Sequence, residues 1–352
     1  MQIDGQTVKI EYVWIDGFRP WGMRSKVKVT RVDDEAVMRL NAGDRRYAPK
    51  WGFDGSSTNQ ATGNDSDCIL QPVRVIPDPT EVHDYIALCE VLCGDGAPHP
   101  TNKRNALARL VDAVETQEPW FGMEQEYTII DEGRPLGFPV SAQHYPRPQG
   151  IYYCSVGGDR AFGRGIADDH MNACIEAGIF VTGTNAEVCP GQWEYQVGGP
   201  GQGPLVASDQ LWLSRWLLLK IAETYNVTVT FDPKPMMGDW NGAGCHCNFS
   251  TKVMREDGGL AHIEAACKKI GENVDKHLDV YGDGLELRLT GDHETCSYKE
   301  FRWGIADRTA SIRIPRQVAT DGHGYLEDRR PNANCDPYDV TRVILESVCL
   351  SG

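Results

Sequence analysis

The sequence predicts an α+β protein with a small, strand-rich N-terminal domain and a larger domain in which helices and strands mix. Two observations predict the division. Strand-like runs dominate up to residue 93, and a turn-rich segment, CGDGAPHP, follows over Cys93–Pro100. Beyond it, runs with helical spacing alternate with strand-like runs, which indicates a second domain of mixed composition.

Three segments of the N-terminal part are expected to form strands. Val8–Ile15 opens with alternating apolar and polar residues, and Lys26–Val32 repeats the pattern. Tyr85–Leu92 is mostly apolar and suits a buried strand. The segment Phe53–Asp67 between them is rich in Gly, Ser, Asn and Asp, so we expect a long loop there.

The remainder of the chain is expected to alternate between helices and strands. Thr101 is the expected cap of a helix that runs to about Gln117, and Gly178 is a typical helix stop. Strands are expected at Phe121–Ile130 and Val227–Phe231, and further helices at Asp168–Ala177, Ser208–Tyr225 and Ala261–Leu278.

Composition excludes several classes of function. The 352 residues carry a net charge of −15 and no basic stretch, which argues against binding nucleic acid. No apolar run approaches the roughly 18 residues of a membrane helix, and the N-terminus does not resemble a signal peptide. The 12 cysteines are scattered without a CxxC pair, so we expect free thiols in a cytoplasmic protein.

Two pairs of carboxylates are candidates for a metal site. Glu124 and Glu126 lie two apart in a strand-like run, so both side chains leave the same face and repel each other without a cation. A solvent-exposed strand face is the commoner explanation of such a pair. A hairpin closing at Pro190-Gly191 would place Glu187 opposite Glu194, again an unfavourable pair unless the two lie at a solvated hairpin tip.

His246 and a short charged segment extend the set. A single histidine is more often a core residue than a ligand, and the sequence Cys-His-Cys around it lacks the spacing of a zinc site. In a strand, Glu327 and Arg329 share one face, whereas Asp328 and Arg330 share the other. An ion-pair ladder would account for that segment without any ligand.

Carboxylates with one imidazole suit Mg²⁺ or Mn²⁺ better than zinc or iron. Such ions screen ATP phosphates in phosphoryl transfer, yet neither GxxxxGK[ST] nor GxGxxG occurs in the chain. Positive charge for a nucleotide would therefore come from arginines, and DRTASIRIPR supplies Arg308, Arg313 and Arg316.

Six segments in order resemble the glutamine synthetase family, specifically its eukaryotic-type class (class II). FDGSSTNQATGNDSDCIL is similar to the N-terminal signature of the family, and KPMMGDWNGAGCHCNFS to its ATP-binding signature. The others are GMEQEYT, GTNAEVCPGQWEYQVG, RLTGDHET and RTASIRIPR. The resemblance runs from Trp14 to Pro337 and implies a β-grasp-like domain over residues 1–97. It also implies a catalytic domain over residues 98–352, with a curved antiparallel sheet flanked by helices.

The resemblance implies two metal sites for Mg²⁺ or Mn²⁺ in each active site. The first would be held by Glu126, Glu187 and Glu194, and the second by Glu124, His246 and Glu327. For glutamate it implies contacts from Trp240, Asn241, Gly242, Arg288, Arg308 and Arg329. For the co-substrate ATP it implies contacts from Glu124, Asn248, Ser250, Arg308, Arg313 and Tyr325.

The implied reaction is the ATP-dependent amidation of L-glutamate by ammonia through a γ-glutamyl phosphate. Asp54, with Ser57 nearby, matches the base that deprotonates ammonium, contributed across a subunit interface. Glu294 matches a flap residue that shields the intermediate, Tyr153 belongs to the ammonium pocket, and Arg308 and Arg329 stabilise the phosphoryl group. The expected assembly is a decamer of two stacked pentameric rings with active sites between subunits.

The sequence departs from the family pattern in several places. Asp307 stands where Asn is usual, directly before Arg308, and its charge could weaken ATP binding. The segment Gly17–Arg24 differs and the C-terminus is short. One alternative is a γ-glutamylamide ligase that uses an organic amine, and another is an inactive structural relative. Ammonia is favoured over the first alternative by four matching residues, Asp54, Ser57, Tyr153 and Glu294. The six retained ligands oppose the second.

Overall fold

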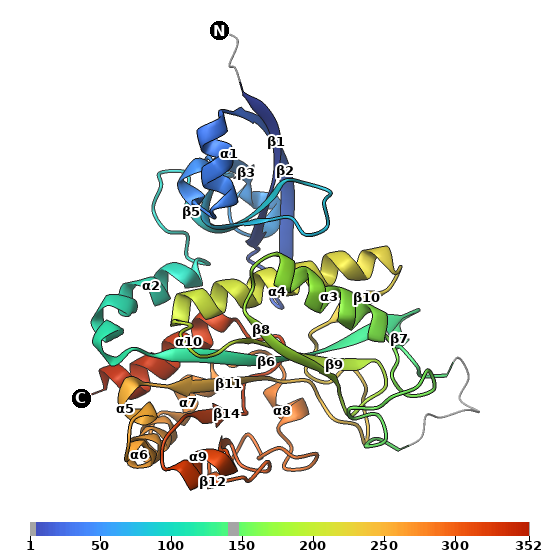
Figure 1. The fold of residues 1–352 in the computed structure, drawn as a ribbon, viewed down its shortest axis with the longest axis vertical. Helices are drawn as coiled ribbons and strands as arrows, with labels where there is room; N and C mark the ends of the chain where they lie inside the picture. The colour runs from blue at the N-terminus through green and yellow to red at the C-terminus, as the bar shows by residue number, and fades with distance from the viewer. Residues whose placement is uncertain (1–4, 140–147, 352) are drawn as a thin grey trace. The chain divides into compact units, whose positions relative to one another are not determined.

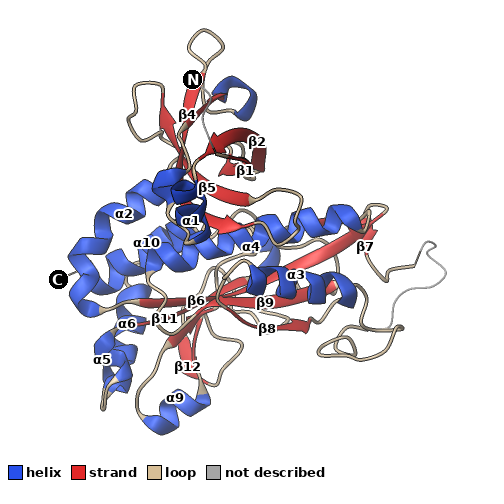
Figure 2. Ribbon diagram, turned by 45° about the horizontal axis from the view of Figure 1, so that its top comes forward, coloured by secondary structure: helices blue, strands red, loops and turns tan. Residues whose placement is uncertain are grey.

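The computed structural model describes residues 5–139 and 148–351. Contacts between Cα atoms divide the chain into a small unit, residues 1–106 with 172–179, and a large unit, residues 107–171 with 180–352. Each unit is a mixed α+β structure, as the sequence predicts (Figures 1 and 2).

The described part of the small unit contains a five-stranded sheet in the order β2-β1-β5-β4-β3. Its elements are β1 (Gln6–Ile15), β2 (Met23–Val32), α1 (Asp34–Asn41), β3 (Trp51–Asp54), β4 (Asp67–Pro77) and β5 (Tyr85–Cys93). The central strands β1 and β5 are parallel, whereas the other neighbours are antiparallel. This mixed order, with one helix after the first hairpin, agrees with the expected β-grasp-like arrangement.

Helix α1 shows how the local sequence builds this unit. Asp33 caps the helix by accepting a hydrogen bond from the Ala36 backbone N–H at 2.8 Å. Ala36 and Leu40 are four residues apart and are both buried, so one helix face supplies apolar contacts. Leu40 joins the core formed by the inward side chains of the sheet, among them Ile10 and Leu70.

The large unit is built on a sheet of nine strands in the described residues, with β6 at its centre. The strands are β6 (Trp120–Asp131), β7 (Arg134–Pro135), β8 (Val181–Ala186), β9 (Gln192–Gly198), β10 (Thr228–Thr230), β11 (Cys245–Ser250), β12 (Trp303–Ile305), β13 (Ile312–Ile314) and β14 (Leu326–Asp328). All described pairs are antiparallel except β12 with β13. The expected antiparallel sheet is therefore present, with one parallel pair at its edge.

Helices cover one face of this sheet, where α4 and α10 lie along it (Figure 1). The helices are α2 (Lys103–Val114), α3 (Arg164–Glu176), α4 (Pro204–Thr224), α5 (Lys252–Arg255), α6 (Gly259–Gly271), α7 (Val274–Leu278), α8 (Leu285–Arg288), α9 (Arg316–Asp321) and α10 (Pro337–Leu345). Helix α4 is buried on nearly every side, so its sequence is apolar without a marked polar face. None of the helices in the described part of the chain is long and apolar enough to cross a membrane.

Two details of the expected helices were wrong. Helix α2 begins at Lys103, and the side chain of Asn102, rather than that of Thr101, accepts from a first-turn N–H, at 3.0 Å from Asn105 N. Thr101 instead bonds to His99. The single helix expected over Ala261–Leu278 is divided into α6 and α7, with the break at residues 272–273. All twelve cysteines lie in described residues and are free thiols.

Candidate active site

Four neighbouring strands carry carboxylates and one imidazole to the same face of the large sheet. Glu126 on β6 lies opposite Glu194 on β9, and Glu124 on β6 lies opposite His246 on β11. Glu327 on β14 faces the residue two positions after His246. Because laterally paired residues and residues two apart share a face, the register brings these five side chains together.

The distances within this group are short enough for shared ligation. His246 Nδ1 lies 3.4 Å from Glu124 Oε2 and 3.4 Å from Glu327 Oε1. Its Nε2 lies 3.9 Å from Glu126 Oε1. Single ligand atoms of Glu124, Glu194 and His246 all lie within 4.8 Å of one another, an arrangement that could hold a metal ion.

The predicted pairing of Glu187 with Glu194 was wrong. Strand β8 ends at Ala186, which pairs with Trp193, so Asn185 is the residue opposite Glu194. The connection is a loop over residues 187–191 in which Gly191 adopts a φ of +70°, rather than a two-residue turn. Glu187 nevertheless reaches the group from this loop, because it lines the same cavity.

Burial and mutual repulsion make the carboxylates of this group hard to ionise together. Burial raises the pKa of Glu194 to about 9, and the charges of Glu124, Glu126 and Glu187 add to the shift. Burial, and then Glu126, raise the pKa of Glu187 to about 8. A cation among them would reverse both effects. Burial also holds the pKa of His246 well below its usual value, so the imidazole is neutral and able to ligate a metal.

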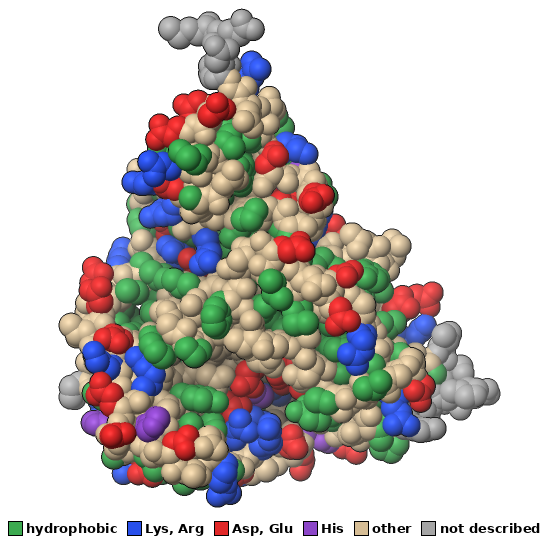
Figure 3. All heavy atoms as spheres, viewed as in Figure 1, with side chains coloured by type: hydrophobic (Ala, Val, Ile, Leu, Met, Phe, Trp, Pro, Cys, Tyr) green, Lys and Arg blue, Asp and Glu red, His purple; other side chains and the backbone are tan. Residues whose placement is uncertain are grey.

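These carboxylates border a cavity of about 610 Å³, here called the acidic cavity. Figure 3 shows acidic side chains within a hollow of the large unit and basic side chains near it. The predicted site residues that line it are Glu124, Glu126, Tyr153, Glu187, Glu194, Asn241, Gly242, His246, Arg288, Glu294, Arg308, Arg313 and Arg329.

Arginines surround Glu327, which is itself fully buried. Arg329 donates to Glu327 Oε1 at 2.7 Å, and Arg313 forms an ion pair with Oε2. On the opposite strand face, Arg330 donates to Asp328 Oδ1 at 2.9 Å and Oδ2 at 2.5 Å. The predicted alternation of the two ion pairs is therefore confirmed, and one of them borders the cavity.

Arg288 is buried and braces the chain beside the acidic cavity. Its guanidinium donates to the backbone carbonyls of Arg329 at 3.0 Å and Arg330 at 3.2 Å, and its NH2 lies 3.0 Å from His246 Nε2. Burial lowers its pKa to about 10, which leaves it charged at neutral pH. Arg288 thus supplies positive charge at the cavity wall while its donors hold the segment after Glu327.

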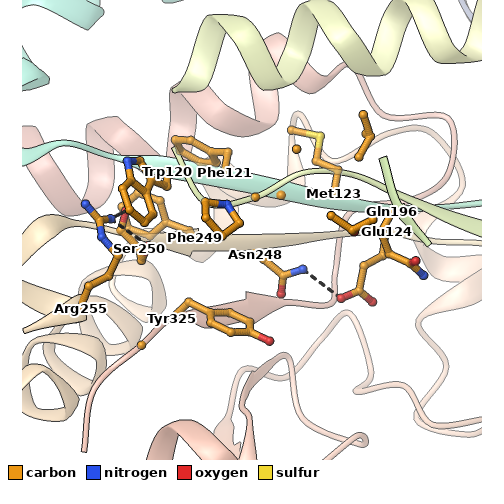
Figure 4. A pocket seen from close by; sticks show the side chains of 17 residues that line it. Trp120, Phe121, Met123, Glu124, Gln196, Asn248, Phe249, Ser250, Arg255 and Tyr325 are labelled. Carbon is orange, nitrogen blue, oxygen red and sulfur yellow. Dashed lines mark hydrogen bonds between the residues drawn. The ribbon is translucent and has the colours of Figure 1, made fainter. Parts of the chain in front are cut away.

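A second cavity of about 380 Å³, here called the aromatic cavity, is drawn in Figure 4 and shares Glu124 and Gln196 with the acidic cavity. Trp120, Ser250, Arg255 and Tyr325 line it, and the Arg255 guanidinium lies 3.5 Å from the centre of the Trp120 ring system. Arg255 also donates to Ser250 Oγ at 3.0 Å. A flat indole faced by a guanidinium is suited to a planar, electron-rich ring such as a nucleobase.

Glu124 connects the two cavities because it lines both. Asn248, from the predicted ATP set, donates from Nδ2 to Glu124 Oε1 at 2.9 Å (Figure 4). A nucleotide with its base in the aromatic cavity would therefore extend towards the carboxylate cluster. Arg308 and Arg313 line the acidic cavity only.

Four of the sequence-predicted residues do not line these cavities. Glu327 is one of them, although Arg313 and Arg329, which pair with it, line the acidic cavity. Trp240 is absent from the described lining of both, and its ring packs on Phe138 with 5.1 Å between centroids. Asp54 and Ser57 belong to the small unit. Asp54 accepts from Ser56 Oγ at 2.6 Å and Ser57 Oγ at 2.8 Å, and these bonds, with that of Ser56 foremost, lower its pKa. Asp54 is therefore an exposed, stable carboxylate.

Several residues in or beside the cavities were not predicted from the sequence. Gln192 donates to Glu126 Oε2 at 3.1 Å, and Gln196 forms a hydrogen bond with Glu194. Both glutamines lie two positions from Glu194 on β9, so strand alternation could have identified them. Arg255 gave no such signal, because only the fold brings it to the strand that begins at Trp120.

Asp307 has local partners that were not expected. Its Oδ2 accepts from Arg302 at 2.7 Å, and its Oδ1 accepts from the Thr309 backbone N–H at 2.8 Å. The hydrogen bonds from Thr309 are the main reason why its pKa is lowered. The Asp307 carboxylate, which directly precedes Arg308, is thus already bonded to neighbours in its own loop.

Comparisons with known proteins agree with this arrangement. The family model "Glutamine synthetase, catalytic domain" matches residues 101–264. A glutamine synthetase of Streptomyces viridochromogenes is 50% identical over 347 residues, which cover 97% of each chain. The chain belongs to the glutamine synthetase family. A family member from Agaricus bisporus is 48% identical over 98% of this chain and 94% of its own.

The fold is shared more widely than the sequence. A solved structure titled "Apo GmaS without ligand" superposes with a TM-score of 0.72 and covers 96% of this chain and 77% of that one. Its sequence identity is 19%, so it supports the fold alone. Glutamine synthetases are ATP-dependent, metal-using ligases that act on glutamate and ammonia, and the acidic cluster is a possible metal site of that kind.

Proposed function

We propose that this ligase forms L-glutamine by transferring the terminal phosphoryl group of ATP to the γ-carboxylate of L-glutamate and then replacing phosphate with ammonia. The observation that supports this most strongly is that four carboxylates of the predicted metal ligands and the neutral imidazole of His246 line one cavity, which shares Glu124 with the aromatic cavity. A metal site and a nucleotide site would then be adjacent, as the two-step reaction requires.

The residues around the acidic cavity fit divalent ions that prefer oxygen ligands. Glu126, Glu187 and Glu194 would hold one ion, and Glu124, His246 and Glu327 a second. When bound, Mg²⁺ or Mn²⁺ would screen the phosphate charges of ATP. The raised pKa values of Glu187 and Glu194 support this assignment, because a metal-free cluster carries uncompensated repulsion.

The nucleotide is proposed to occupy the aromatic cavity with its base near Trp120 and Arg255. Asn248, Ser250 and Tyr325 would contact its remaining parts, with the phosphates directed past Glu124. This orientation is supported by the wall shared between the cavities. We assign Trp240 a supporting role for the adjoining segment that carries Asn241 and Gly242, because its ring packs on Phe138.

Glutamate is proposed to bind at Asn241 and Gly242, with Arg288 providing positive charge. Arg308, Arg313 and Arg329 would stabilise the charge that develops on the transferring phosphoryl group. All six of these residues line the acidic cavity. The γ-carboxylate oxygen attacks phosphorus, ADP leaves, and the resulting acyl phosphate is reactive enough for ammonia to displace phosphate.

Ammonium must lose a proton before it can attack. Asp54 of a neighbouring copy is proposed to bind ammonium and accept this proton, with Ser57 holding the carboxylate. The hydroxyl donors to Asp54 support an anion that attracts a cation. Tyr153 would border the ammonium site and Glu294 would cover the intermediate. A ring assembly, expected to be two stacked pentamers, supplies Asp54 in trans, and a cytoplasmic location suits the free thiols.

The amine preference of the purified protein tests the proposal. With ATP, glutamate and Mg²⁺, we expect ADP release to depend on ammonium and to exceed that with methylamine, ethanolamine or putrescine. Glu327→Ala should abolish the activity. Preference for an organic amine would move the chain to the γ-glutamylamide ligases, and inactivity with every amine would refute a ligase function.

A further inference from the structure

A loop over residues 289–299, between α8 and β12, carries Glu294 at the edge of the acidic cavity. His293 and Glu294 are consecutive residues with φ of 52° and 59°, in the left-handed region that residues with a side chain seldom adopt. Such a conformation persists only when surrounding contacts hold it. Contacts from other segments must therefore fix this loop.

Gln149 provides one of these contacts from a separate segment of the large unit. Its Nε2 donates to His293 Nδ1 at 2.7 Å, and its Oε1 accepts from the Asn241 backbone N–H at 2.8 Å. On the far side of the imidazole, His293 Nε2 lies 3.0 Å from Asp239 Oδ1. One amide thus joins the Glu294 loop to the segment that carries Asn241 and Gly242.

The direction of each hydrogen bond is determined by this geometry. The Asn241 N–H can only donate, so it requires the oxygen of Gln149 to face it and the NH2 group to face His293. His293 Nδ1 must then accept, which places the ring proton on Nε2, where it is donated to Asp239. The chain of hydrogen bonds is complete with a neutral imidazole in one tautomer.

The loop is also attached on the side of the metal cluster. Arg329 Nη2 donates to the Glu294 backbone carbonyl at 3.4 Å, while Nη1 of the same guanidinium donates to Glu327. Glu294 therefore lies between an attachment to β14 and the attachment through Gln149. The Arg329 contact alone is long, so the Gln149–His293 bond is the shorter restraint on the backbone that orients Glu294.

We propose that Gln149 is a positioning residue that latches the loop bearing Glu294 over the acidic cavity by bonding it to the segment that carries Asn241. This rests on the proposed function, since the latch protects γ-glutamyl phosphate. Water can hydrolyse that intermediate. Its oxygen attacks the carbonyl carbon, phosphate leaves with the bonding electron pair, and the attacking water releases a proton. Attack by its own α-amino nitrogen likewise expels phosphate and closes a five-membered lactam. Both routes consume ATP without forming glutamine.

The test measures ADP and glutamine in the same samples of the full-length protein with ATP, glutamate, ammonium and Mg²⁺. The wild type should form them in equimolar amounts, whereas Gln149→Ala and His293→Leu should raise the ratio of ADP to glutamine by about fivefold to tenfold. Gln317→Ala removes an exposed amide on α9, and His262→Ala an exposed imidazole on α6; both should keep the wild-type ratio.

A conservative variant separates positioning from general stability. In His293→Asn, the side-chain oxygen can take the place of Nδ1 and accept from Gln149, and Asn tolerates positive φ. We expect it to restore coupling relative to His293→Leu. The double variant of Gln149→Ala and His293→Leu should be no more uncoupled than either single variant, because both remove the same bond.

The outcomes distinguish the latch from the underlying reaction. If the wild type makes no glutamine, the proposed function fails. If the wild type is coupled and Gln149→Ala remains equally coupled, the latch is refuted. Amide hydrogen exchange over residues 290–299 provides a second measurement that needs no turnover, in the glutamate-bound protein. Gln149→Ala should accelerate it by about fivefold or more, and unchanged exchange would also refute the latch.

Discussion

Removal of metal should make the stability of this protein fall as pH rises through neutrality. The folded metal-free state raises the pKa of Glu194 from 4.5 to about 9 and that of Glu187 from 4.5 to about 8. Between these limits the folded state binds more protons than the unfolded state, so the free energy of unfolding decreases with pH. Below about pH 4 both states are protonated and this loss is absent.

The slope can be estimated without relying on the size of either shift. Each proton held only by the folded state costs about 1.4 kcal/mol of stability for every pH unit. Two such carboxylates would lose on the order of 5 kcal/mol between pH 5 and pH 7, less any relief from relaxation of the cluster. That is a large part of the roughly 5–15 kcal/mol that stabilises a typical domain.

Urea unfolding of chelator-treated protein at several pH values, at one protein concentration, measures this effect. Glu194→Gln should be more stable than the wild type at pH 8 and should show a shallower pH dependence, since it removes one ionisation. Glu286→Gln, at an exposed position of α8, should keep the wild-type slope. Saturating Mg²⁺ should flatten the wild-type curve. Metal-free stability that is constant or rises from pH 6 to pH 8, with no effect of Glu194→Gln, would refute the reasoning.

Three further predictions follow from particular contacts. Arg255→Ala should raise the KM for ATP by about tenfold and leave that for glutamate unchanged, measured by steady-state kinetics, because the indole loses its facing guanidinium. Asp307→Asn should change the KM for ATP by less than about twofold, since Arg302 already pairs with the carboxylate, and a larger improvement would show that its charge does reach the nucleotide. Asp328→Asn should lower the free energy of unfolding by about 3 kcal/mol or more in urea titrations, because Arg330 is left buried without its counter-charge; a loss under 1 kcal/mol would contradict this.

Some of the fold was accessible from sequence because local pattern and environment agree. Strands β1, β5 and β6 are buried on at least one face and are rich in apolar residues, so their periodicity predicts them directly. Strand β11 was harder to predict, because its CHCNFS run gives no simple alternation although it lies between β6 and β14. Helix α1 was missed because only two of its residues are buried and the apolar signal is weak.

The pairing of Glu187 shows a limit of local reasoning about the site. Pro190-Gly191 suggests a two-residue turn, yet the loop is longer, and the strand register is set by packing of Trp193 and Tyr195 in the core. Glu187 still reaches the cavity, but from a loop rather than from a strand. The sequence therefore identified a member of the cluster while predicting the wrong route by which it arrives.

The sequence by itself determined the residue types of the site, the family to which the chain belongs, and the strand faces on which Glu124 and Glu126 lie. Those features follow from chemistry and from the two-residue period of a strand, which depend only on near neighbours. Tertiary structure alone decided that β6, β9, β11 and β14 lie side by side. It also decided that Arg255 faces Trp120 and that Gln149 reaches His293, 144 positions away. Contacts of that kind depend on how distant segments pack together, which no local pattern encodes.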